Sequence, residues 1–431
     1  MDTITLHKVN RLEGIIIPPP DKSISHRAIF FSSIANGKSY IHNFLNAADP
    51  ISTINAFKEL GVNIKEEKSI KDRNFLIVEG TGLFSLKKPN KVIDCGNSGT
   101  TIRLLTGLLS ACPFHSVLTG DESLRGRPMS RVIKPLRRMH ASIEDNEYPP
   151  VKIWGGGLSP IYYDMPIASA QVKTAIILAA MLTEGTTVIR QPIMSRDHTE
   201  QMLKAYGADI SVEGLNISVT GATELHAVDI TVPGDFSSAA FFICASQIIK
   251  GSEIRIINVG LNPTRTGLLN VLTKMGANIE KINENTKSGE QIGSLNCGCP
   301  DALKAVTIKE DQIPFLIDEF PIIAVLATQA EGTTTITGAS ELRVKESDRI
   351  TAMATELTKM GADVEQLPDG MIIRGKTNLK GARVSSHNDH RIAMALSIAA
   401  LVAEGDTLIE GKSAVDISFP EFYPTLERLI K

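Results

Sequence analysis

The chain has 431 residues, 42% of them hydrophobic and 22% charged, and its formal net charge is −3 at pH 7. This length exceeds what a single hydrophobic core usually supports, so we expect two domains, and the composition excludes an intrinsically disordered protein. The slightly acidic balance argues against a broad nucleic-acid-binding surface, so a site for anions would have to be a local cluster of cations.

Signals for export, membrane insertion and metal binding are weak. The first residues, MDTITLHKVN, lack the basic and then apolar pattern of a secretory signal, and no apolar run reaches the roughly 20 residues that span a bilayer. The five cysteines are scattered, and Cys297 and Cys299 have no second Cys or His cluster that would complete a zinc site. We therefore expect a cytoplasmic protein with reduced thiols and no metal.

After a strand-like segment, IIIPPP, one pattern recurs six times along the chain. Each copy is an apolar helical run that ends at a turn and is followed by a short β-rich segment. Most copies continue with a second helix end and a strand, as in FKELGVNI or LTKMGADV. Each repeat therefore predicts the order β-α-β-α-β-β. The turn residues, 66 to 81 positions apart, are Gly37, Pro113, Gly185, Gly251, Gly332 and Gly405.

The first helix of each repeat is apolar on nearly all faces, as in IILAAMLTEG, which indicates a buried helix. Six such helices predict an α/β protein of two globules, each with helices packed inside a shell of sheet. A doubly wound dinucleotide-binding sheet is not expected, because no G-x-G-x-x-G opens a first βα turn.

The segments that lead into these helices carry Asp, Asn or Ser where an N-cap belongs. Capping alone can explain any single copy. Helix N-termini also carry partial positive charge and free N–H groups, so six of them facing one cleft would bind highly charged small molecules. The six segments are PPPDKSISHR, DCGNSGTTIR, MPIASAQVKTA, VPGDFSSAA, LIDEFPII and SSHNDHRIA.

Several of these segments add cations that a cap does not need. In the first, Ser23 and Arg27 are four residues apart and share a helix face, and Lys22 lies just outside the helix start. In the second, Gly99 lets backbone approach a ligand closely. Arg127 lies before Pro128 at the start of the next helix, where it could clamp a carboxylate or phosphate. Solvated surface charges remain the alternative for each of them.

Later repeats extend the set. Ser169 and Gln171 can donate hydrogen bonds to phosphate or hydroxyl groups. Lys345 and Arg349 are predicted to lie four residues apart on one helix face, where an anion would relieve their repulsion. Arg391 falls in the first turn of a helix, where a cation opposes the helix dipole. A bound anion would explain a cation at this position.

Two acidic residues, Asp318 and Glu319, lie within the apolar run IPFLIDEFPII. Asp318 is either an N-cap or a general base, because a carboxylate in apolar surroundings near cations can accept a proton.

Collinear motifs over nearly the whole chain resemble those of the EPSP (5-enolpyruvylshikimate-3-phosphate) synthases. DKSISHR is similar to their Lys-Ser-x-x-x-x-Arg motif and NSGTTIRLL to their Asn-x-x-Thr-x-x-Arg segment. GDESLRGRPM, SAQVKTA, MSRDHTE, IDEFP, RVKESDR, DHRIAMA and SFPEF follow in the family's order. SAQVK, RDHTE and IDEFP resemble the class II variety of the family.

The resemblance implies a two-domain inside-out α/β barrel with three βαβαββ units per domain. Residues 21–234 would form the N-terminal lobe, on the shikimate 3-phosphate side. Residues 1–20 and 235–431 would form the C-terminal lobe, on the phosphoenolpyruvate side and with the catalytic Asp. The active site would lie in the cleft between the lobes.

The implied activity is transfer of the enolpyruvyl group of phosphoenolpyruvate to the 5-hydroxyl of shikimate 3-phosphate, in the pathway to chorismate and aromatic amino acids. Asp318 would take the hydroxyl proton, and Glu346 or Lys22 would handle the methylene proton. A tetrahedral intermediate would then lose phosphate without any cofactor. The expected partners are these two substrates and the inhibitor glyphosate, and we expect a monomer that binds neither nucleic acid nor membrane.

The family's substrate contacts carry over by motif. Shikimate 3-phosphate would be held by Lys22, Ser23, Arg27, Ser169, Gln171, Arg196, Asp318 and Lys345. Phosphoenolpyruvate would be held by Lys22, Gly99, Arg127, Gln171, Arg349 and Arg391.

The chain departs from the class I pattern in two places. Ile417, not Lys, precedes Ser418-Phe419-Pro420, with Lys412 several residues earlier, and Glu341 replaces an Asn. Contacts of Lys412 and Glu341 with substrate are therefore open. Gly99 predicts sensitivity to glyphosate, since family members with Ala there tend to resist it.

Three other functions remain as alternatives, and one of them is a non-enzymatic anion-binding module, which phosphate release from phosphoenolpyruvate would exclude. Enolpyruvyl transfer to UDP-N-acetylglucosamine usually goes with Lys-Asn at the position of Lys22-Ser23 and with a reactive Cys near residues 121–128, whereas this chain has no Cys between Cys112 and Cys244. An RNA 3′-phosphate cyclase-like enzyme would need an ATP site and a basic track for RNA.

Overall fold

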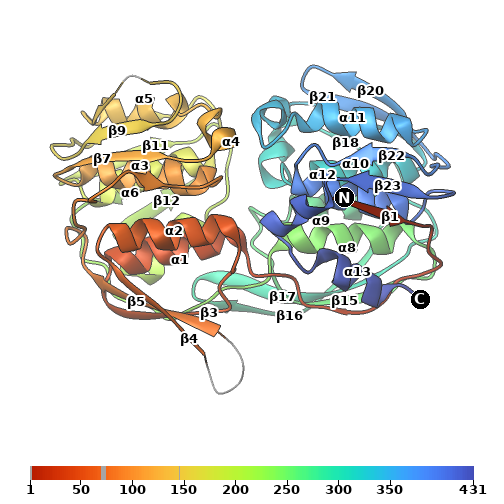
Figure 1. Ribbon diagram of the computed structural model, residues 1–431, viewed down its shortest axis with the longest axis horizontal. Coiled ribbons are helices and arrows are strands. Elements are labelled where there is room, and N and C mark those ends of the chain that lie inside the picture. Colours follow the sequence, from red (N-terminus) through yellow and green to blue (C-terminus); the bar gives the residue numbers. More distant parts are fainter. Residues whose placement is uncertain (1, 69–73, 145) are drawn as a thin grey trace. The chain divides into compact units, whose positions relative to one another are not determined.

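The computed structural model describes residues 2–68, 74–144 and 146–431 (Figure 1). The chain divides into two compact units. Unit 1 takes Met1–Pro19, Gly234–Asn285 and Gln291–Lys431, and unit 2 takes Pro20–Pro233 and Thr286–Glu290. The short second segment of unit 2 lies at the tip of a β-hairpin whose remainder belongs to unit 1, an assignment that the sequence repeats do not predict.

The described part of unit 2 is built from three four-stranded sheets, in the orders β14-β3-β5-β4, β6-β7-β9-β8 and β10-β11-β13-β12. The strands are β3 (Asn36–His42), β4 (Asn63–Lys68), β5 (Asn74–Thr81), β6 (Ile93–Asp94), β7 (His115–Thr119), β8 (Ser142–Ile143), β9 (Val151–Trp154), β10 (Tyr162–Asp164), β11 (Thr186–Arg190), β12 (Ile210–Glu213), β13 (Asn216–Thr220) and β14 (Ile230–Thr231). The helices are α1 (Lys22–Ile34), α2 (Ala48–Glu59), α3 (Gly99–Ala111), α4 (Glu122–Arg125), α5 (Ser130–Arg138), α6 (Ala170–Met181) and α7 (His198–Ala205).

Unit 1 repeats the arrangement, with sheets in the orders β16-β17-β15-β2, β18-β19-β21-β20 and β1-β23-β22. Its strands are β1 (Thr3–Leu6), β2 (Glu13–Ile16), β15 (Glu253–Gly260), β16 (Asn278–Lys287), β17 (Glu290–Gly298), β18 (Thr307–Ile308), β19 (Gly332–Ile336), β20 (Asp363–Leu367), β21 (Gly370–Gly375), β22 (Arg383–Ser385) and β23 (Thr407–Glu410). Its helices are α8 (Phe236–Ile248), α9 (Gly267–Met275), α10 (Phe320–Gln329), α11 (Arg349–Lys359), α12 (His390–Ala400) and α13 (Phe422–Leu429), with the 3₁₀ helices η1 (Glu310–Phe315), η2 (Ser340–Val344) and η3 (Lys412–Ile417).

The sheets show the predicted βαβαββ order. In the second repeat β6 and β7 are parallel, with α3 as the crossover between them, and β9 and β8 add antiparallel strands. A crossover helix is the usual way to join parallel neighbours. Three sheets take a strand from a distant part of the chain: β14 lies beside β3, β2 beside β15, and β1 beside β23.

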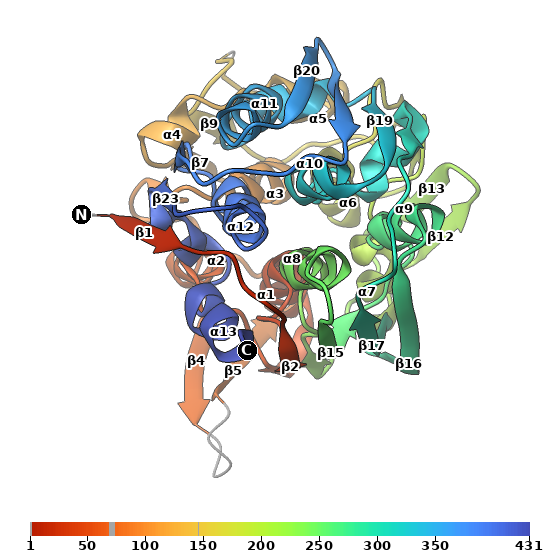
Figure 2. The ribbon, with the colours of Figure 1, turned by 90° about the vertical axis from the view of Figure 1, so that its right-hand side faces the viewer.

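The apolar helices form the centre of each unit, as predicted. Every residue of α6 from Val172 to Met181 is buried, and α8, α10 and α12 contact one another in unit 1. Figure 2 shows these three helices close together, with strands of unit 1 around them. In unit 2, α3 and α6 approach so closely that a Cβ on Gly107 would lie 2.1 Å from the carbonyl oxygen of Ala175. The α/β class with helices inside the sheets is therefore confirmed.

Most predicted caps are present, because a side-chain oxygen accepts a hydrogen bond from a first-turn N–H. This holds for Asp21, Ser98, Ser169, Asp235 and Asp389. At α10 the N-cap position is Glu319, with no side-chain cap, so the capping interpretation of Asp318 is wrong.

The prediction that Lys345 and Arg349 share a helix face is also wrong. Lys345 follows η2 with a non-helical backbone (φ −85°, ψ −148°), and α11 begins only at Arg349. The reason is Asp348, whose carboxylate accepts from the backbone N–H of Thr351 and so starts the helix there.

None of the helices in the described ranges combines the length and apolar character needed to cross a membrane. Within the same ranges, no group of three or more His, Cys, Asp or Glu side chains is arranged to hold a metal ion.

Candidate active site

In unit 2, the first turn of α1 presents a cation beside a carboxylate. The Asp21 side chain caps the helix, and Lys22 Nζ lies 3.1 Å from Asp49 Oδ2 of α2. Lys22 is the first residue of α1, not a residue outside the helix as the sequence suggested. Ser23 contributes its backbone carbonyl to Arg27 NH1 at 3.1 Å.

Arg27 is a buried guanidinium whose hydrogen bonds go to neutral groups. It is 3% exposed, and its Nε and NH2 donate to the hydroxyls of Thr199 and Thr174 at 2.8 and 3.1 Å. The pKa of Arg27 is lowered to about 10, chiefly by burial and in part by the half-buried Arg196, whereas Glu200 opposes the shift. Two cations in such surroundings favour the binding of an anion, which would stabilise both charges.

A buried ion pair lies on the two helices that carry the hydroxyl partners of Arg27. Lys173 Nζ lies 2.6 Å from Glu200 Oε1, and both side chains are buried. Since a buried charge is costly unless paired, this contact fixes α6 against α7, the helices that carry Thr174 and Thr199. The pair therefore supports the hydrogen bonds to Arg27.

A second cationic group lies at the N-terminus of α3. A Cβ on Gly99 would be 3.0 Å from Arg103 NH1 and 3.4 Å from Arg127 NH1, so both guanidiniums lie against this residue. Arg127 NH2 donates to Asn97 Oδ1 at 2.6 Å, and Asn97 in turn donates to Asp121. Glycine therefore leaves open the space beside two cations and free helix N–H groups.

Gln171 links this group to α6. Its Oε1 accepts from Arg103 NH1 at 2.6 Å, and its Nε2 donates to Thr100 Oγ1 at 3.0 Å. Ser169 caps α6, with its Oγ 3.4 Å from the backbone N of Val172. Gln171 is thus positioned by the same arginine that adjoins Gly99.

Three helices of unit 2, α1, α2 and α3, are joined by a series of hydrogen bonds between buried side chains. His26 Nδ1 pairs with Thr53 Oγ1 at 2.7 Å, Thr53 with Thr101 Oγ1 at 2.7 Å, and Thr101 with Ser98 Oγ at 2.8 Å. Burial lowers the pKa of His26 to about 3, so its ring stays neutral at ordinary pH. These hydrogen bonds connect α1, α2 and α3 without a charged group.

In unit 1, Asp318 lies among three arginines. Its Oδ2 is 3.1 Å from Arg265 NH1 and 3.3 Å from Arg391 NH2, and its Oδ1 is 3.6 Å from Arg349 NH1. The carboxylate is 17% exposed and so remains accessible. Three guanidiniums stabilise its charged form, which is the form a general base requires.

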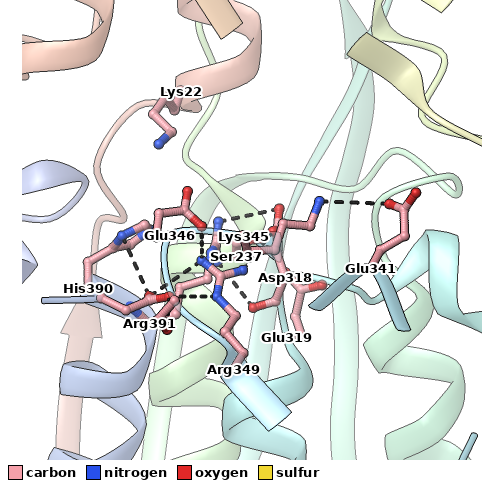
Figure 3. Close-up of polar contacts among 12 residues, drawn as sticks. Lys22, Ser237, Asp318, Glu319, Glu341, Lys345, Glu346, Arg349, His390 and Arg391 are labelled. Atoms are coloured by element: carbon pink, nitrogen blue, oxygen red, sulfur yellow. Dashed lines mark hydrogen bonds and ion pairs between the residues drawn. The ribbon is translucent and has the colours of Figure 1, made fainter. Parts of the chain in front are cut away.

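Arg349 is the most buried of these arginines and lies beside three carboxylates (Figure 3). Its Nε lies 2.8 Å from Asp389 Oδ2 and its NH2 lies 2.7 Å from Glu346 Oε2. Burial lowers the pKa of Arg349, but Asp389, Glu346 and Asp318 outweigh burial and raise this pKa above its ordinary value. Glu346 is thereby held next to the same guanidinium as Asp318.

Lys345 is less tightly held. Its side chain is 32% exposed, and its Nζ lies 4.0 Å from Glu341 Oε2. Partial burial lowers the pKa of Lys345, against the opposing effect of Glu341, Asp318 and Glu346. This ammonium has few close contacts to lose when an anionic ligand binds. Lys412 is exposed and lies near Asp2, whose side chain bonds Ser413.

Four members of the unit 1 group are not predicted as functional residues by the sequence. Arg265 joins Asp318 to Asp235, and Asp389 binds both Arg349 and the backbone N–H of Arg391. Ser237 donates to the buried Glu319. The sequence pattern predicts Asp389 and Asp235 only as caps, and Arg265 follows a Pro-containing turn that matches no motif.

Known proteins resemble the chain over its whole length. A family model described as EPSP synthase (3-phosphoshikimate 1-carboxyvinyltransferase) matches residues 6–426. A relative from Thermodesulfovibrio yellowstonii, named 3-phosphoshikimate 1-carboxyvinyltransferase, is 53% identical over 430 residues, which are 99% of each chain.

Solved structures also resemble the chain over nearly its whole length. EPSP synthase from Acinetobacter baumannii has 43% identity and a TM-score of 0.89, and the match covers 100% of this chain and 98% of that one. The enolpyruvyl transferase NikO from Streptomyces tendae, at 18% identity and a TM-score of 0.79, matches 99% of this chain and 97% of its own and shares the fold. This chain therefore belongs to the EPSP synthase family.

Proposed function

We propose that this protein transfers the enolpyruvyl group of phosphoenolpyruvate to the 5-hydroxyl of shikimate 3-phosphate and releases phosphate. Its membership of the EPSP synthase family supports this reaction. The observation that carries the chemical assignment is Asp318, a partly exposed carboxylate among three guanidiniums. A base beside cations suits a reaction in which a hydroxyl attacks a highly anionic co-substrate.

The substrates together bring about five negative charges, which need cations to lie close together. Shikimate 3-phosphate is assigned to the buried Arg27 with its neutral partners, to Arg196, and to Lys345. Lys22, Ser23, Ser169, Gln171 and Asp318 complete its proposed contacts. Phosphoenolpyruvate is assigned to Lys22, Gly99, Arg127, Gln171, Arg349 and Arg391.

Phosphoenolpyruvate would change the surroundings of the base. Arg391 and Arg349 both contact Asp318 in this structure. An anion that pairs with these two guanidiniums weakens their interaction with Asp318. The carboxylate of Asp318 then becomes a stronger proton acceptor. Binding of the co-substrate would thus prepare Asp318 for its task.

The reaction proceeds in two steps. Asp318 accepts the proton of the 5-hydroxyl while the oxygen of that hydroxyl bonds to C2 of phosphoenolpyruvate. Glu346 or Lys22 delivers a proton to the methylene carbon. The same group then takes a proton back from the resulting methyl group, the carbon–carbon double bond re-forms, and the phosphate departs with the electrons of its bond to C2. Lys22 belongs to unit 2 and Asp318 to unit 1, so both units contribute to one reaction.

We further propose a monomeric, cytoplasmic protein that glyphosate inhibits. Gly99 supports the inhibition, since a Cβ there would press on Arg103 and Arg127. Unchanged activity in millimolar glyphosate would contradict it.

The experiment that tests the function is a coupled assay of phosphate release from phosphoenolpyruvate. Shikimate 3-phosphate and UDP-N-acetylglucosamine serve as alternative acceptors, and a reaction without acceptor is the blank. Release only with shikimate 3-phosphate is expected. Release only with UDP-N-acetylglucosamine would assign the sister reaction, and no release with either acceptor would refute enolpyruvyl transfer.

A further inference from the structure

Arg265 lies in a tightly folded loop between β15 and α9. Asn262 organises the loop, because its Oδ1 accepts from the N–H and the hydroxyl of Thr264 at 2.9 and 2.7 Å. Its carbonyl accepts from the backbone N–H of Arg265 at 2.9 Å and of Thr266 at 3.1 Å. The loop therefore fixes the Arg265 backbone before its side chain makes any contact.

The Arg265 side chain joins two carboxylates. Its NH2 lies 3.1 Å from Asp235 Oδ1, and its NH1 lies 3.1 Å from Asp318 Oδ2. The same Asp235 oxygen accepts from the backbone N–H of Ser237 at 2.7 Å, so it is anchored to the first turn of α8. Arg265 thus ties Asp318 to a fixed point of a buried helix.

Packing brings the two segments together independently of charge. A Cβ on Gly267, two residues after Arg265, would lie 2.7 Å from the Cβ of Phe315 and 2.8 Å from its carbonyl oxygen. Phe315 ends η1, three residues before Asp318. The loop and the segment that carries Asp318 therefore meet both at Gly267 and at Arg265.

Among the three arginines around Asp318, Arg265 is the one that the substrate assignment does not use. Its side chain is 3% exposed, and its two amino groups face Asp235 and Asp318. Arg391 and Arg349 are assigned to phosphoenolpyruvate and would turn toward it. Only Arg265 would then keep its contact with the carboxylate.

We propose that Arg265 is a positioning residue that holds Asp318 Oδ2 in place while phosphoenolpyruvate is bound to Arg349 and Arg391. The inference rests on the proposed role of Asp318 as the base. A planar guanidinium can bind two carboxylates with two separate N–H groups, whereas the ammonium of a lysine is a point charge without this geometry. Charge alone is therefore insufficient at this position.

The test is a double-mutant cycle with Arg265→Gln, Asp318→Asn and the double variant, measured as kcat and KM for both substrates. Arg265→Gln is expected to lower kcat by about 10²-fold, since a misplaced catalytic group costs about that much, with little change in either KM. In the Asp318→Asn background the same change is expected to lower kcat by less than about threefold, because the group it positions is already lost.

Two further variants separate positioning from folding. Arg265→Lys keeps the charge and is expected to recover only part of kcat. Asp235→Asn keeps the helix cap but removes the second carboxylate, and it is expected to lower kcat less than Arg265→Gln. The matched control is Arg374→Gln, since Arg374 also joins two carboxylates, Asp363 and Glu365, but on the surface of unit 1. It is expected to leave kcat unchanged.

The pH profile gives a readout that a purely structural role would not move. Removing a cation beside Asp318 favours its protonated form, so the acid limb of kcat/KM should move to higher pH in Arg265→Gln. Near-normal kcat in folded Arg265→Gln, full rescue by Arg265→Lys, or equal effects in both backgrounds would each overturn the inference. Near-normal kcat in Asp318→Asn alone would instead remove the proposed base. If Arg265→Gln does not fold, wild-type kcat in Asp235→Asn overturns the proposal.

Discussion

At the scale of residues, the two units differ in how their charges are satisfied. In unit 2, Arg27 bonds hydroxyls and a backbone carbonyl, and Arg127 bonds an amide. In unit 1, Arg349 bonds Asp389 and Glu346. An anion arriving at Arg27 meets a cation without a bonded carboxylate, whereas an anion at Arg349 competes with carboxylates that are already bound. The unit 1 carboxylates thus lower the affinity for anions but leave Asp318 beside the cations that are proposed to bind phosphoenolpyruvate.

The first prediction concerns Asp318. Asp318→Asn keeps the shape and the hydrogen-bond acceptor but removes the base, so turnover should fall by about 10² or more while shikimate 3-phosphate still binds. Steady-state kinetics and calorimetric titration measure the two quantities. Asp363→Asn, at a surface aspartate paired with Arg374, is the control. Turnover within threefold of the wild type would remove Asp318 from its assigned role.

At the scale of elements, the helix N-termini of each unit are held in place by close packing and buried hydrogen bonds. Helices α3 and α6 meet at Gly107, which has no room for a side chain. Arg103 on α3 and Gln171 on α6 bond each other near the N-termini of these helices. The distance between the two helices therefore decides whether the groups around Gly99 stay together.

The second prediction follows from this contact. In Gly107→Ala the new Cβ meets backbone atoms of Ala175, which cannot move aside, so overpacking should lower the free energy of unfolding by about 1–3 kcal/mol. The higher helix propensity of alanine offsets about 1 kcal/mol at most. Urea denaturation compares this variant with Gly126→Ala, where the nearest atom would be 3.5 Å away. Equal stability of the two variants would contradict the account.

The third prediction concerns pH and the chain of hydrogen bonds that joins α1, α2 and α3. Burial lowers the pKa of His26 to about 3, whereas a histidine of the unfolded chain titrates near about 6.5. Between these values only the unfolded state takes up the proton. His26 therefore destabilises the fold progressively as the pH falls from about 6.5 toward about 3, by up to about 1.4 kcal/mol per pH unit.

His26→Gln should remove that dependence. The pH slope of the unfolding free energy between pH 4.5 and 6.5 should decrease by up to about one proton. The measurement is denaturant unfolding at several pH values, with the same substitution at the exposed His226 as the control for loss of a histidine. Parallel slopes for His26→Gln and the wild type would show that His26 is not buried as a neutral ring.

At the scale of the whole molecule, the repeats made the architecture predictable. Apolar helices with capping residues and turns about 70 residues apart predicted buried helices inside sheets. Local signals could not place Arg265, since its contact with Asp318 joins residues 53 positions apart. They also misplaced Lys345, because a spacing of four residues looks helical even where an aspartate starts a new helix at Arg349. Both cases depend on tertiary packing, which no short motif encodes.

The proposed reaction requires both Lys22 and Asp318. The most direct measurement is a rapid-quench single turnover with saturating shikimate 3-phosphate and phosphoenolpyruvate, in the wild type, in Lys22→Met of unit 2 and in Asp318→Asn of unit 1. The account predicts that each substitution slows product formation by about 10² or more. Product formation at the wild-type rate in either variant would contradict it.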